Sequence, residues 1–353
     1  MRAMSLAFAR PRLVHPAAHY EPRTSDGILV LQRGENASTD YYLRPRLQRA
    51  GMPGAIADLA DAPDRCAMLG PGGAEALTVV FCRYASPGWL EALERARERL
   101  ARVVLFMDDD LPAVVRDHEL PSAARGKVAL HFSAHAERMS GLCSELWVSS
   151  EVLAQRYAAA GARLLAPLPE AEPPEPSEAA LQRVVYHGTD VHAPERRFVL
   201  EVARRVAGQA PSIPFEIVGD EALARAASSC ASVTVVPQRP WADYLAAQAH
   251  ERAAISLAPL FASVVNEARA PVKVFDAARL GAAGLYADAP AYRGFVRGGH
   301  DGLLLPMDPD AWAAAIVALA ADPARRVGLA AAARGRLVGM LAADGGFPSA
   351  PSG

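Results

Sequence analysis

Cysteine is scarce in this sequence, and its four copies lie far apart. Cys66, Cys82, Cys143 and Cys230 form no CxxC pair. This spacing excludes an evident zinc ribbon and disfavours a disulfide scaffold. We therefore expect four reduced, mostly buried thiols in a cytoplasmic protein.

The sequence also lacks a long apolar run and an excess of charge of one sign. No stretch approaches the roughly 18 apolar residues of a membrane span, so we expect none. The 37 Lys and Arg residues nearly balance the 39 Asp and Glu residues, which leaves a formal net charge of −2. This balance disfavours a protein that works through counterion release on nucleic acid, and it disfavours a polybasic membrane binder. We expect no nucleic-acid partner.

The usual glycine-rich nucleotide loops are missing as well. The segment Gly70-Pro-Gly72-Gly73 would need a sixth-position glycine to form a dinucleotide loop, and Glu75 stands there. No GxxxxGK[ST] loop occurs. A simple dehydrogenase or a P-loop enzyme is therefore disfavoured.

What the sequence has is a repeated alternation of short apolar runs with amphipathic stretches. Continuous apolar runs of this kind are typical of strands buried on both faces of a parallel sheet. We predict strands at 27–32, 77–82, 103–107, 145–149, 163–167, 184–186, 215–218, 233–236, 254–257, 284–286 and 302–305. We predict helices from about 40, from 87, and over 123–142, 150–160, 195–207, 241–250, 271–280, 308–321 and 323–341.

A change of composition separates two halves of this pattern. Residues 167–176 hold five prolines in ten positions, so this segment is neither helix nor central strand and is typical of a semi-rigid linker. Alternation on both sides of it predicts two Rossmann-like parallel-sheet α/β domains. The predicted organisation is an N-terminal extension (1–25), a first domain (26–166), the linker (167–180), a second domain (181–341) and a disordered tail (342–353).

Ligands of such sheets bind beyond the carboxyl ends of the strands, close to the switch point of strand order. Two domains whose strand ends face each other would form a cleft there. The candidate positions are the loop at Gly34, Arg83, the Asp108 cluster, His187-Gly188-Thr189, Gly219-Asp220 and the loop after Pro259.

The segment Asn266–Gly281 holds the densest set of candidate residues. Lys273 falls in the first turn of a helix that begins near Pro271, and Asp276 shares its face three residues later. A helix N-terminus with a lysine is typical of a diphosphate site, and a carboxylate one turn later can accept the hydroxyls of a ribose. An ordinary surface ion pair would give the same spacing.

Several segments carry a resemblance to a known family. They are Tyr186–Thr189, Phe215–Asp220, Leu257–Leu260, Asn266–Gly281, Gly284–Asp288 and Tyr292–Leu305. From Tyr186 to about Arg336, the chain resembles the C-terminal domain of GT-B glycosyltransferases of the group 1, family 4-like type. The first half resembles the family more loosely, through Phe106–Asp110 and Glu145–Ser150. The resemblance implies a GT-B fold, with two Rossmann-like domains facing across a cleft.

The resemblance also implies roles for individual residues of the second domain. A nucleotide sugar would be held mainly by this domain, with Lys273 on the diphosphate and Asp276 on the ribose. Gly188 and Thr189 would approach the phosphates or the sugar, because glycine permits close backbone approach. His187 is either a site residue or a structural one.

One departure from the family pattern concerns an acid. Many retaining members carry Glu-x7-Glu in this stretch; Asp276 stands at the second acid, but Ala268 occupies the first position. Glu267 is out of register by one residue. We therefore expect Asn266 or Arg269 to take over the contact of the first acid, and the stereochemistry stays open.

The run Asp108-Asp109-Asp110 follows a predicted strand and has three interpretations. It is a polar, helix-capping loop, or it supplies the general base for an acceptor hydroxyl, with Asp109 or Asp110 as that base. The third interpretation is a metal-binding motif, which the two-domain pattern disfavours, because GT-B enzymes generally need no metal at this step.

The resulting prediction is a metal-independent glycosyltransferase that moves a sugar from a nucleotide-sugar donor to a glycan, lipid or protein acceptor. It needs no cofactor other than that donor, and the family allows peripheral association with a membrane. One alternative is a GT-B-like sugar-nucleotide epimerase or hydrolase; another is a non-catalytic GT-B subunit that binds a partner transferase. The sequence makes no prediction of the oligomeric state, the donor or the acceptor.

Overall fold

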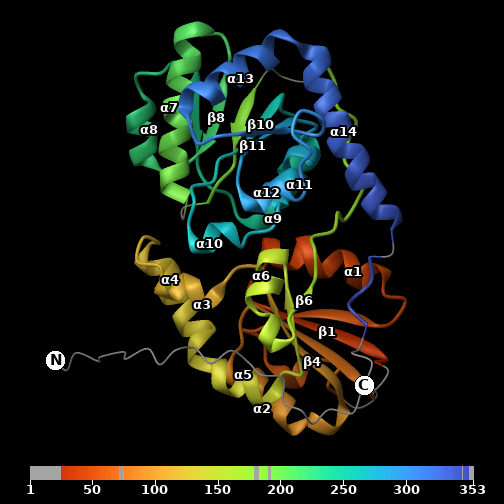
Figure 1. Cartoon of the computed structure of the whole chain (residues 1–353). Helices are drawn as coiled ribbons and strands as arrows, with labels where there is room; N and C mark the ends of the chain where they lie inside the picture. The colour runs from red at the N-terminus through yellow and green to blue at the C-terminus, as the bar shows by residue number, and fades with distance from the viewer. Residues whose placement is uncertain are drawn as a thin grey trace, which may run out of the picture. The chain divides into compact units, whose positions relative to one another are not determined.

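The chain forms two compact units in the computed structural model (Figure 1). The structure describes residues 25–343 and 345–349, except 71, 72, 74, 179–182, 190 and 191. Unit 1 comprises the chain up to Ala166 together with the segment that begins at Gly346, and unit 2 comprises Pro167–Gly345. The predicted extension 1–25 lies, apart from residue 25, outside the described residues.

Unit 1 is built on a six-stranded sheet in the order β2-β1-β3-β4-β5-β6, in which every neighbouring pair is parallel. Its strands are β1 (Gly27–Gln32), β2 (Gly54–Asp58), β3 (Leu77–Cys82), β4 (Leu100–Met107), β5 (Glu145–Val148) and β6 (Arg163–Leu164). Its helices are α1 (Arg44–Arg49), α2 (Pro87–Arg95), α3 (Leu111–Arg116), α4 (Ser122–His131), α5 (Ala136–Leu142) and α6 (Glu151–Arg156). A π-helical turn over Thr39–Leu43 precedes α1.

Unit 2 repeats this plan with a parallel sheet in the order β12-β11-β10-β7-β8-β9. Its strands are β7 (Val184–Tyr186), β8 (Phe215–Val218), β9 (Val233–Val236), β10 (Ile255–Ala258), β11 (Ala283–Ala287) and β12 (Leu303–Leu305). Its helices are α7 (Ala193–Gln209), α8 (Glu221–Ala227), α9 (Trp241–His250), α10 (Val264–Glu267), α11 (Val272–Arg279), α12 (Pro290–Arg293), α13 (Pro309–Ala321) and α14 (Pro323–Ala342).

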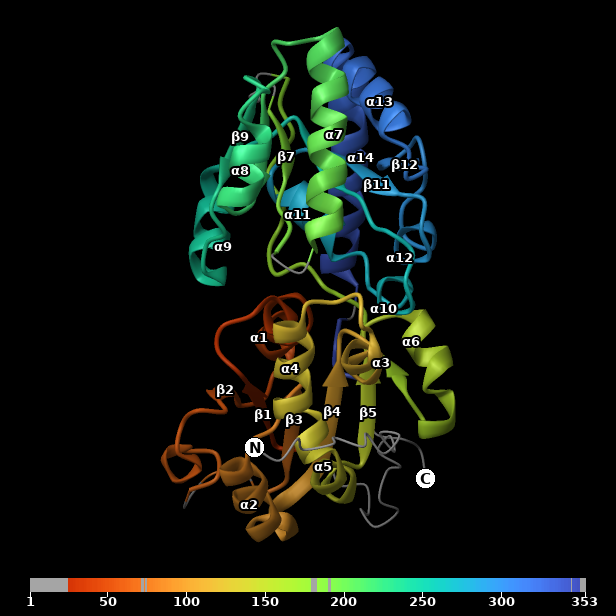
Figure 2. The ribbon, with the colours of Figure 1, turned by 90° about the vertical axis from the view of Figure 1, so that its left-hand side faces the viewer.

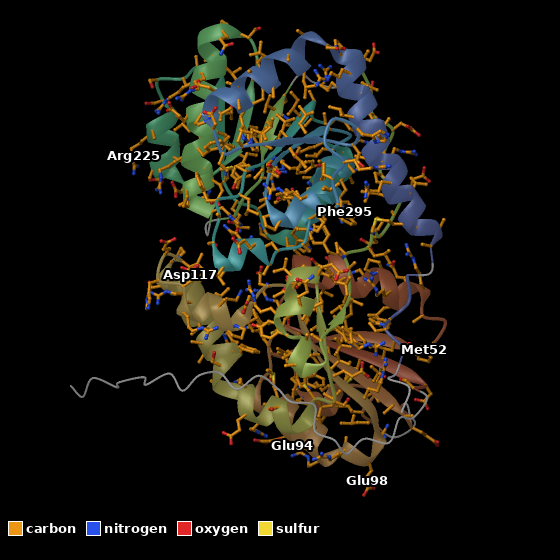
Figure 3. The ribbon with its side chains drawn as sticks, in the orientation of Figure 1. Met52, Glu94, Glu98, Asp117, Arg225 and Phe295 are labelled. Atoms are coloured by element: carbon orange, nitrogen blue, oxygen red, sulfur yellow. The ribbon has the colours of Figure 1, made fainter. Side chains whose placement is uncertain are left out.

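The central strands are buried and mostly apolar because helices cover both faces of each sheet. Every residue of β1, β3, β10 and β11 is buried. In unit 2, α7 packs beside α13 and α11 packs beside α14 (Figure 2). Side chains fill the space between helices and sheet, whereas Arg225 on α8 points outward (Figure 3). The predicted pair of parallel α/β sheets is confirmed.

Strand order reverses once in each sheet, and this defines where a ligand can bind. In unit 1 the chain leaves β1 toward β2 and then returns to add β3 on the other side of β1. In unit 2 the same reversal occurs between β7 and β10. The loops that follow the strands on either side of a reversal diverge and leave a crevice at the carboxyl ends.

The last described residues return to unit 1, where we had predicted a disordered tail. Phe347 stacks on Trp147 with ring centroids 5.6 Å apart. Arg102 donates to the carbonyl of Pro348 at 3.0 Å, and Arg46 donates to that of Gly346 at 3.3 Å. An aromatic ring and a set of arginine donors therefore give this short segment partners that its composition does not suggest.

Several further elements differ from the sequence prediction. The edge strand β2 and the helices α3, α8, α10 and α12 were not predicted. The helix predicted over 123–142 is two helices, α4 and α5, joined by a 3-10 turn at Ser133–His135. The helix is interrupted after His131. The ring of Phe132 is buried, and the carbonyl of His131 accepts from the amide of Ala85 at 3.2 Å instead of from an amide one turn later in the helix.

Candidate functional site

The switch point of unit 2 gathers most of the predicted site residues. The loop after β7 holds His187, Gly188 and Thr189, and the segment after β10 leads through α10 to α11. Lys273, in the first turn of α11, donates to the carbonyl of His187 at 2.7 Å. The structure thus brings the two motifs together across the reversal of strand order.

Lys273 is held in place by Asp276. Its Nζ lies 2.9 Å from Oδ2 of Asp276, and Nη1 of Arg279 lies 3.4 Å from Oδ1 of the same carboxylate. The side chain of Asp276 is 5% exposed, whereas that of Lys273 is 32% exposed. Asp276 is therefore an internal anchor here, and the lysine above it is accessible.

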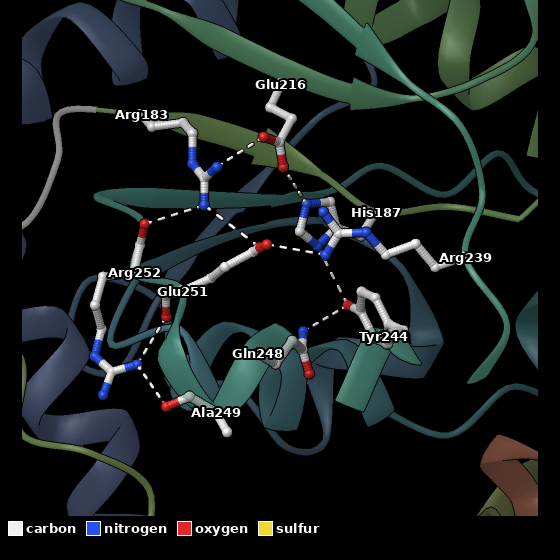
Figure 4. A network of polar contacts seen from close by, with 9 residues as sticks. All are labelled: Arg183, His187, Glu216, Arg239, Tyr244, Gln248, Ala249, Glu251 and Arg252. Atoms are coloured by element: carbon white, nitrogen blue, oxygen red, sulfur yellow. Dashed lines mark hydrogen bonds and ion pairs between the residues drawn. The ribbon is translucent and has the colours of Figure 1, made fainter. Parts of the chain in front are cut away.

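The ring of His187 is fixed from two sides within unit 2 (Figure 4). Its Nε2 lies 3.1 Å from Oε1 of Glu216 on β8, and its Nδ1 lies 3.3 Å from the hydroxyl of Tyr244 on α9. Gln248 donates to that same hydroxyl at 2.6 Å. With its ring engaged, His187 offers its backbone carbonyl, rather than its imidazole, to Lys273.

Glu216 connects His187 to a wider set of charges. Arg183 donates to Oε2 of Glu216 at 2.7 Å and lies 3.6 Å from Glu251. Arg239 donates to Glu251 at 2.9 Å. The hydrogen bond with His187 lowers the pKa of Glu216 below its usual range, and the charge of Arg183 adds to this effect against the opposing effect of burial. This network ties α9 to the strands that carry the site loop.

Gly188 has a packing reason to be glycine. A Cβ at this position would lie 2.3 Å from the hydroxyl of Tyr186, whose side chain is buried. The carbonyl of Thr189 accepts from the amide of His192 at 3.0 Å, which turns the chain into α7. The contact of Gly188 and Thr189 with the phosphates or the sugar of a donor stays a prediction.

A second polar group lies on the same loop. Nη1 of Arg269 is 3.0 Å from Nε2 of His192, whose Nδ1 is 3.7 Å from Glu195. Burial lowers the pKa of His192, and the charge of Arg269 lowers it further. The charge of Lys273 lowers the pKa of His192 too. Arg269, between α10 and α11, and Lys273, in the first turn of α11, are therefore two cations near His192.

The position of the missing first acid is closed to solvent. Ala268 is fully buried, whereas Glu267 is exposed. The side chain of Asn266 donates to the carbonyl of Phe261 at 2.9 Å and so braces the loop before α10. Of the two predicted substitutes, Arg269 is therefore better placed than Asn266 to meet a ligand.

The switch point of unit 1 holds Arg83, Asp108 and Asp109. Arg83 follows β3 with a φ of 72°. Its Nε lies 3.2 Å from Oδ1 of Asp108 and its Nη2 lies 3.6 Å from Oδ2 of Asp109. Burial alone would lower the pKa of Arg83, but Asp108 raises it with a smaller contribution from Asp109. Ser38, at the start of the π-helical turn, donates to Asp108.

Asp110 faces away from this cluster. It caps α3 by accepting from the amide of Ala113 at 3.0 Å, and it contacts Arg156 and the hydroxyl of Tyr157. Its side chain is fully buried. These contacts are those of the helix-capping interpretation, and the three aspartates do not converge on one point. In the described ranges, no group of three or more His, Cys, Asp or Glu side chains is arranged to hold a metal ion.

Sequence reasoning missed the partners that hold the site. Glu216 and Tyr244 support His187, and His192 contacts Arg269, yet they lie on different elements. The sequence could have pointed to His192, because it lies five residues after His187 in the same strand-to-helix loop.

The four cysteines are free, and three are buried, as predicted. None of the helices in the described ranges has the length and apolarity that a membrane crossing requires.

Comparison with sequence families gives a match within the second unit. Residues 182–322 match the family described as Glycosyl transferases group 1. This range contains the His187 loop and the whole Asn266–Gly281 segment. No curated protein matches the chain.

Solved structures resemble the chain over most of its length. HepE from Anabaena, solved with UDP and glucose, shares 15% identity at a TM-score of 0.56; the match covers 89% of this chain and 95% of HepE. Sucrose-phosphate synthase from Thermosynechococcus elongatus shares 14% identity at a TM-score of 0.55, with 90% and 95% covered. TarM from S. aureus shares 9% identity at a TM-score of 0.51, and the match spans 74% of this chain but only 52% of TarM.

These matches define the class of protein. The two parallel sheets have the GT-B fold. Residues 182–322, within unit 2, match the group 1 glycosyl transferase family. The predicted fold class is confirmed, and the predicted family resemblance is confirmed over residues 182–322. The arrangement of the two domains across a cleft stays a prediction.

Proposed function

We propose that this chain is a glycosyltransferase that moves a sugar from a nucleoside diphosphate sugar to a glycan, lipid or protein acceptor. The observation that carries the proposal is the placement of Lys273. It stands in the first turn of α11, accessible and bonded to the carbonyl of His187, at the switch point of the unit that contains the match to the group 1 glycosyl transferase family. HepE, which shares the fold, was solved with UDP and glucose.

Lys273 and Arg269 would stabilise the departing diphosphate. Charged hydrogen bonds from lysine and arginine to phosphate oxygens are among the stronger ones in proteins. The dipole of α11, whose first turn holds Lys273, adds partial positive charge at this end of the helix. Catalysis would come from offsetting the charge that develops on the leaving group, and from holding donor and acceptor in line.

Asp276 and His187 would act in positioning. In the donor complex, Lys273 moves from Oδ2 of Asp276 to the diphosphate, which frees that oxygen for the hydroxyls of the ribose. His187, fixed by Glu216 and Tyr244, keeps the Gly188-Thr189 turn and its own carbonyl in place. His187→Asn should therefore raise KM for the donor more than it lowers kcat, without moving the pH profile.

Asp109 is the remaining candidate for the general base. Its side chain is 22% exposed, whereas Asp110 is buried as the cap of α3. We expect Asp109→Asn to lower kcat in a stable protein, and Asp110→Asn to lower thermal stability. Full activity of both variants would rule out a base in this cluster.

Calorimetric binding of UDP, GDP, ADP and TDP tests the donor site. One nucleotide should bind tightly, and Lys273→Ala should weaken it by about 1.5–3 kcal/mol, the range of a charged hydrogen bond. Arg225→Ala is the control, because its side chain is 73% exposed on the outer face of α8. Equal affinity of Lys273→Ala and wild type would overturn the assignment of the diphosphate site.

A second candidate, a non-catalytic subunit that binds a nucleotide sugar or a partner transferase, is favoured by one observation. The first acid of the family pattern is replaced by the buried Ala268. Nucleotide binding without turnover on any acceptor would support this candidate. Release of free sugar, or of an epimer, without an acceptor would instead support the hydrolase or epimerase alternative.

The proposal includes no cofactor. Arg269 and Lys273 offset the diphosphate charge that a divalent cation would otherwise offset, so we expect turnover to persist in excess EDTA. Free thiols at all four cysteines fit the reducing cytoplasm, where we place the protein. Donor and acceptor are the proposed partners, with peripheral membrane association if the acceptor is a lipid.

A further inference from the structure

His192 lies between a buried acid and one of the two cations of the candidate donor site. Its Nε2 is 3.0 Å from Nη1 of Arg269, and its Nδ1 faces Oε2 of Glu195 at 3.7 Å. His192 and Glu195 lie where the loop after β7 enters α7, whereas Arg269 lies between α10 and α11. The contact therefore joins the two segments that flank the reversal of strand order in unit 2.

The two partners of the ring determine where its proton lies. An arginine side chain only donates hydrogen bonds, so Nε2 of His192 must accept the one from Arg269. A neutral imidazole carries a single proton, which is then on Nδ1 and faces the carboxylate of Glu195. His192 thus presents a lone pair to Arg269 and a proton to Glu195.

Glu195 is a rigid support for this ring. Its side chain is 4% exposed, and its Oε1 accepts from the amide of Phe261, in the loop after β10, at 3.4 Å. Burial opposes the ionised form, but the contact with His192 holds the pKa of Glu195 below its usual range. The carboxylate therefore fixes both the orientation of the imidazole and the start of the loop that leads to Arg269.

Arg269 is less enclosed than the acid that supports it. Glu195 is buried, whereas Arg269 is half-buried. A long arginine side chain loses much of its rotamer freedom when a ligand orders it. A guanidinium that a neighbouring ring already holds loses less, so an anion binds to it more tightly.

We propose that His192 is a positioning residue that holds Arg269 ready for the diphosphate of the donor. The ring acts through Arg269 and does not itself touch the donor. A guanidinium has five N–H donors and can hold a ring nitrogen and phosphate oxygens at the same time. This inference rests on the proposed transferase function and adds to it a residue that sets donor affinity from behind the site.

Protonation of the ring would break this arrangement. The titratable and charged groups that act on His192 or on its two partners are Glu195, Arg269, Lys273, Tyr186 and Tyr292. Both tyrosines are buried with a raised pKa and stay neutral. Burial and the charges of Arg269 and Lys273 lower the pKa of His192 against the effect of Glu195. The ring is therefore neutral at neutral pH, and it loses the lone pair that Arg269 needs only below the ordinary histidine range of about 6.5.

Calorimetric binding of nucleotide sugars to the full chain tests the role of the ring. The probes are UDP-glucose, GDP-glucose, ADP-glucose and TDP-glucose, because a terminal phosphate would itself titrate near pH 6, at about its second pKa. His192→Leu removes the acceptor and should weaken the probe that binds about three- to tenfold, as the cost of ordering one long side chain predicts. His192→Gln should restore affinity, because its Oε1 can replace Nε2 as the acceptor.

A double-mutant cycle separates positioning from a merely structural role. In an Arg269→Gln background, His192→Leu should weaken binding no further, because the residue through which it acts is gone. Equal weakening in both backgrounds, or a His192→Gln variant as weak as His192→Leu, would overturn the inference. His250→Gln is the control, at an exposed histidine that ends α9 before β10 begins, and should bind like wild type.

The pH dependence of the same binding gives a second readout. Wild-type affinity should fall as the pH drops below about 6.5, where histidine ordinarily gains its proton, and the affinity of His192→Gln should stay constant. Tighter binding by wild type at acid pH would show that a charged His192 contacts the donor directly, which contradicts a role through Arg269.

NMR of the ring nitrogens in ¹⁵N-histidine-labelled protein tests the contact without a donor. His192→Gln assigns the signal. We expect the proton on Nδ1 at neutral pH, and a higher titration midpoint in Arg269→Gln, because that variant removes a repelling charge. A proton on Nε2, or an unchanged midpoint, would overturn the inference whatever binds. The expected tautomer with no binding of any probe to wild type would instead refute the donor site of the proposed function, and leave His192 as a support of Arg269 alone.

Discussion

Gly188 lies against the phenol of Tyr186, so a single methyl group should disturb the site loop. A Cβ would come 2.3 Å from the hydroxyl oxygen and 2.6 Å from Cζ, and the buried ring has little room to move. We expect Gly188→Ala to lower the free energy of unfolding by about 1–3 kcal/mol, as overpacked sites do. Differential scanning calorimetry measures this.

Gly328→Ala is the matched control for this variant. Gly328 lies within α14, and a Cβ there meets nothing within 4 Å. Alanine should therefore stabilise unit 2 by about 0.5–1 kcal/mol. If Gly188→Ala were as stable as wild type, Tyr186 would not be what requires glycine at this position.

Glu216 gives unit 2 a component of stability that depends on pH. Because its hydrogen bond with His187 holds the pKa of Glu216 below its usual range, the folded state favours the carboxylate. This contribution is complete above the ordinary glutamate range and is lost as the pH falls through the folded pKa. Glu216→Gln should therefore be less stable than wild type at pH 7, and the gap should narrow toward pH 3.

Denaturant unfolding at several pH values measures that gap. Glu221→Gln is the control, because its side chain is 95% exposed. A gap between Glu216→Gln and wild type that is constant from pH 7 to pH 3 would contradict the role given to the carboxylate charge.

For single residues, the sequence was informative about pairs on one helix and less informative about contacts between distant elements. Lys273 and Asp276 could be paired from their helical spacing, and the structure shows that pair. The supports of His187 come from β8 and α9, and no local pattern connects those elements to the loop after β7. Asp110 could not be separated from Asp109, because adjacent residues turn to different partners only in the folded loop.

Among the secondary-structure elements, the long apolar strands were predictable and the edge strand was not. β1, β3 and β4 are mostly apolar, as strands covered on both faces are. β2 reads Gly-Ala-Ile-Ala-Asp and is half exposed, so neither its composition nor its pattern favours a strand. α8 was missed although Asp220 caps it through the amide of Leu223 at 2.9 Å. That aspartate was assigned to the candidate site instead.

The segment Gly346–Ser349 should contribute to the stability of unit 1. Phe347 stacks on Trp147, which is fully buried. We expect Phe347→Ala to destabilise unit 1 by about 1 kcal/mol, the usual size of an aromatic pair. Pro348→Ala keeps the carbonyl that Arg102 binds and should cost much less. Unfolding followed by tryptophan fluorescence measures both variants, and equal stability of the two would show that the stack contributes nothing.

Across the whole molecule, ligand effects should divide between the two units. If the donor is held mainly by unit 2, a saturating nucleotide stabilises that unit against local opening. The free energy of any opening that releases the nucleotide rises by RT ln(1 + [L]/Kd). We expect hydrogen exchange to slow in the loops after β7 and β10 and to change little around α2 and α5. Lys273→Ala should abolish the effect at the same nucleotide concentration. Uniform protection of both units, or none, would contradict this division.

The return of the chain end to unit 1 has a practical consequence for dissecting the protein. Unit 2 is one continuous stretch, Pro167–Gly345, and can be cloned as a single fragment. Unit 1 is assembled from two separate stretches of the chain. A fragment that stops at Ala166 would therefore lack the ring that stacks on Trp147 and the carbonyl acceptors of Arg46 and Arg102. A circular permutant that fuses 346–353 ahead of the first domain is the better design for producing unit 1 alone.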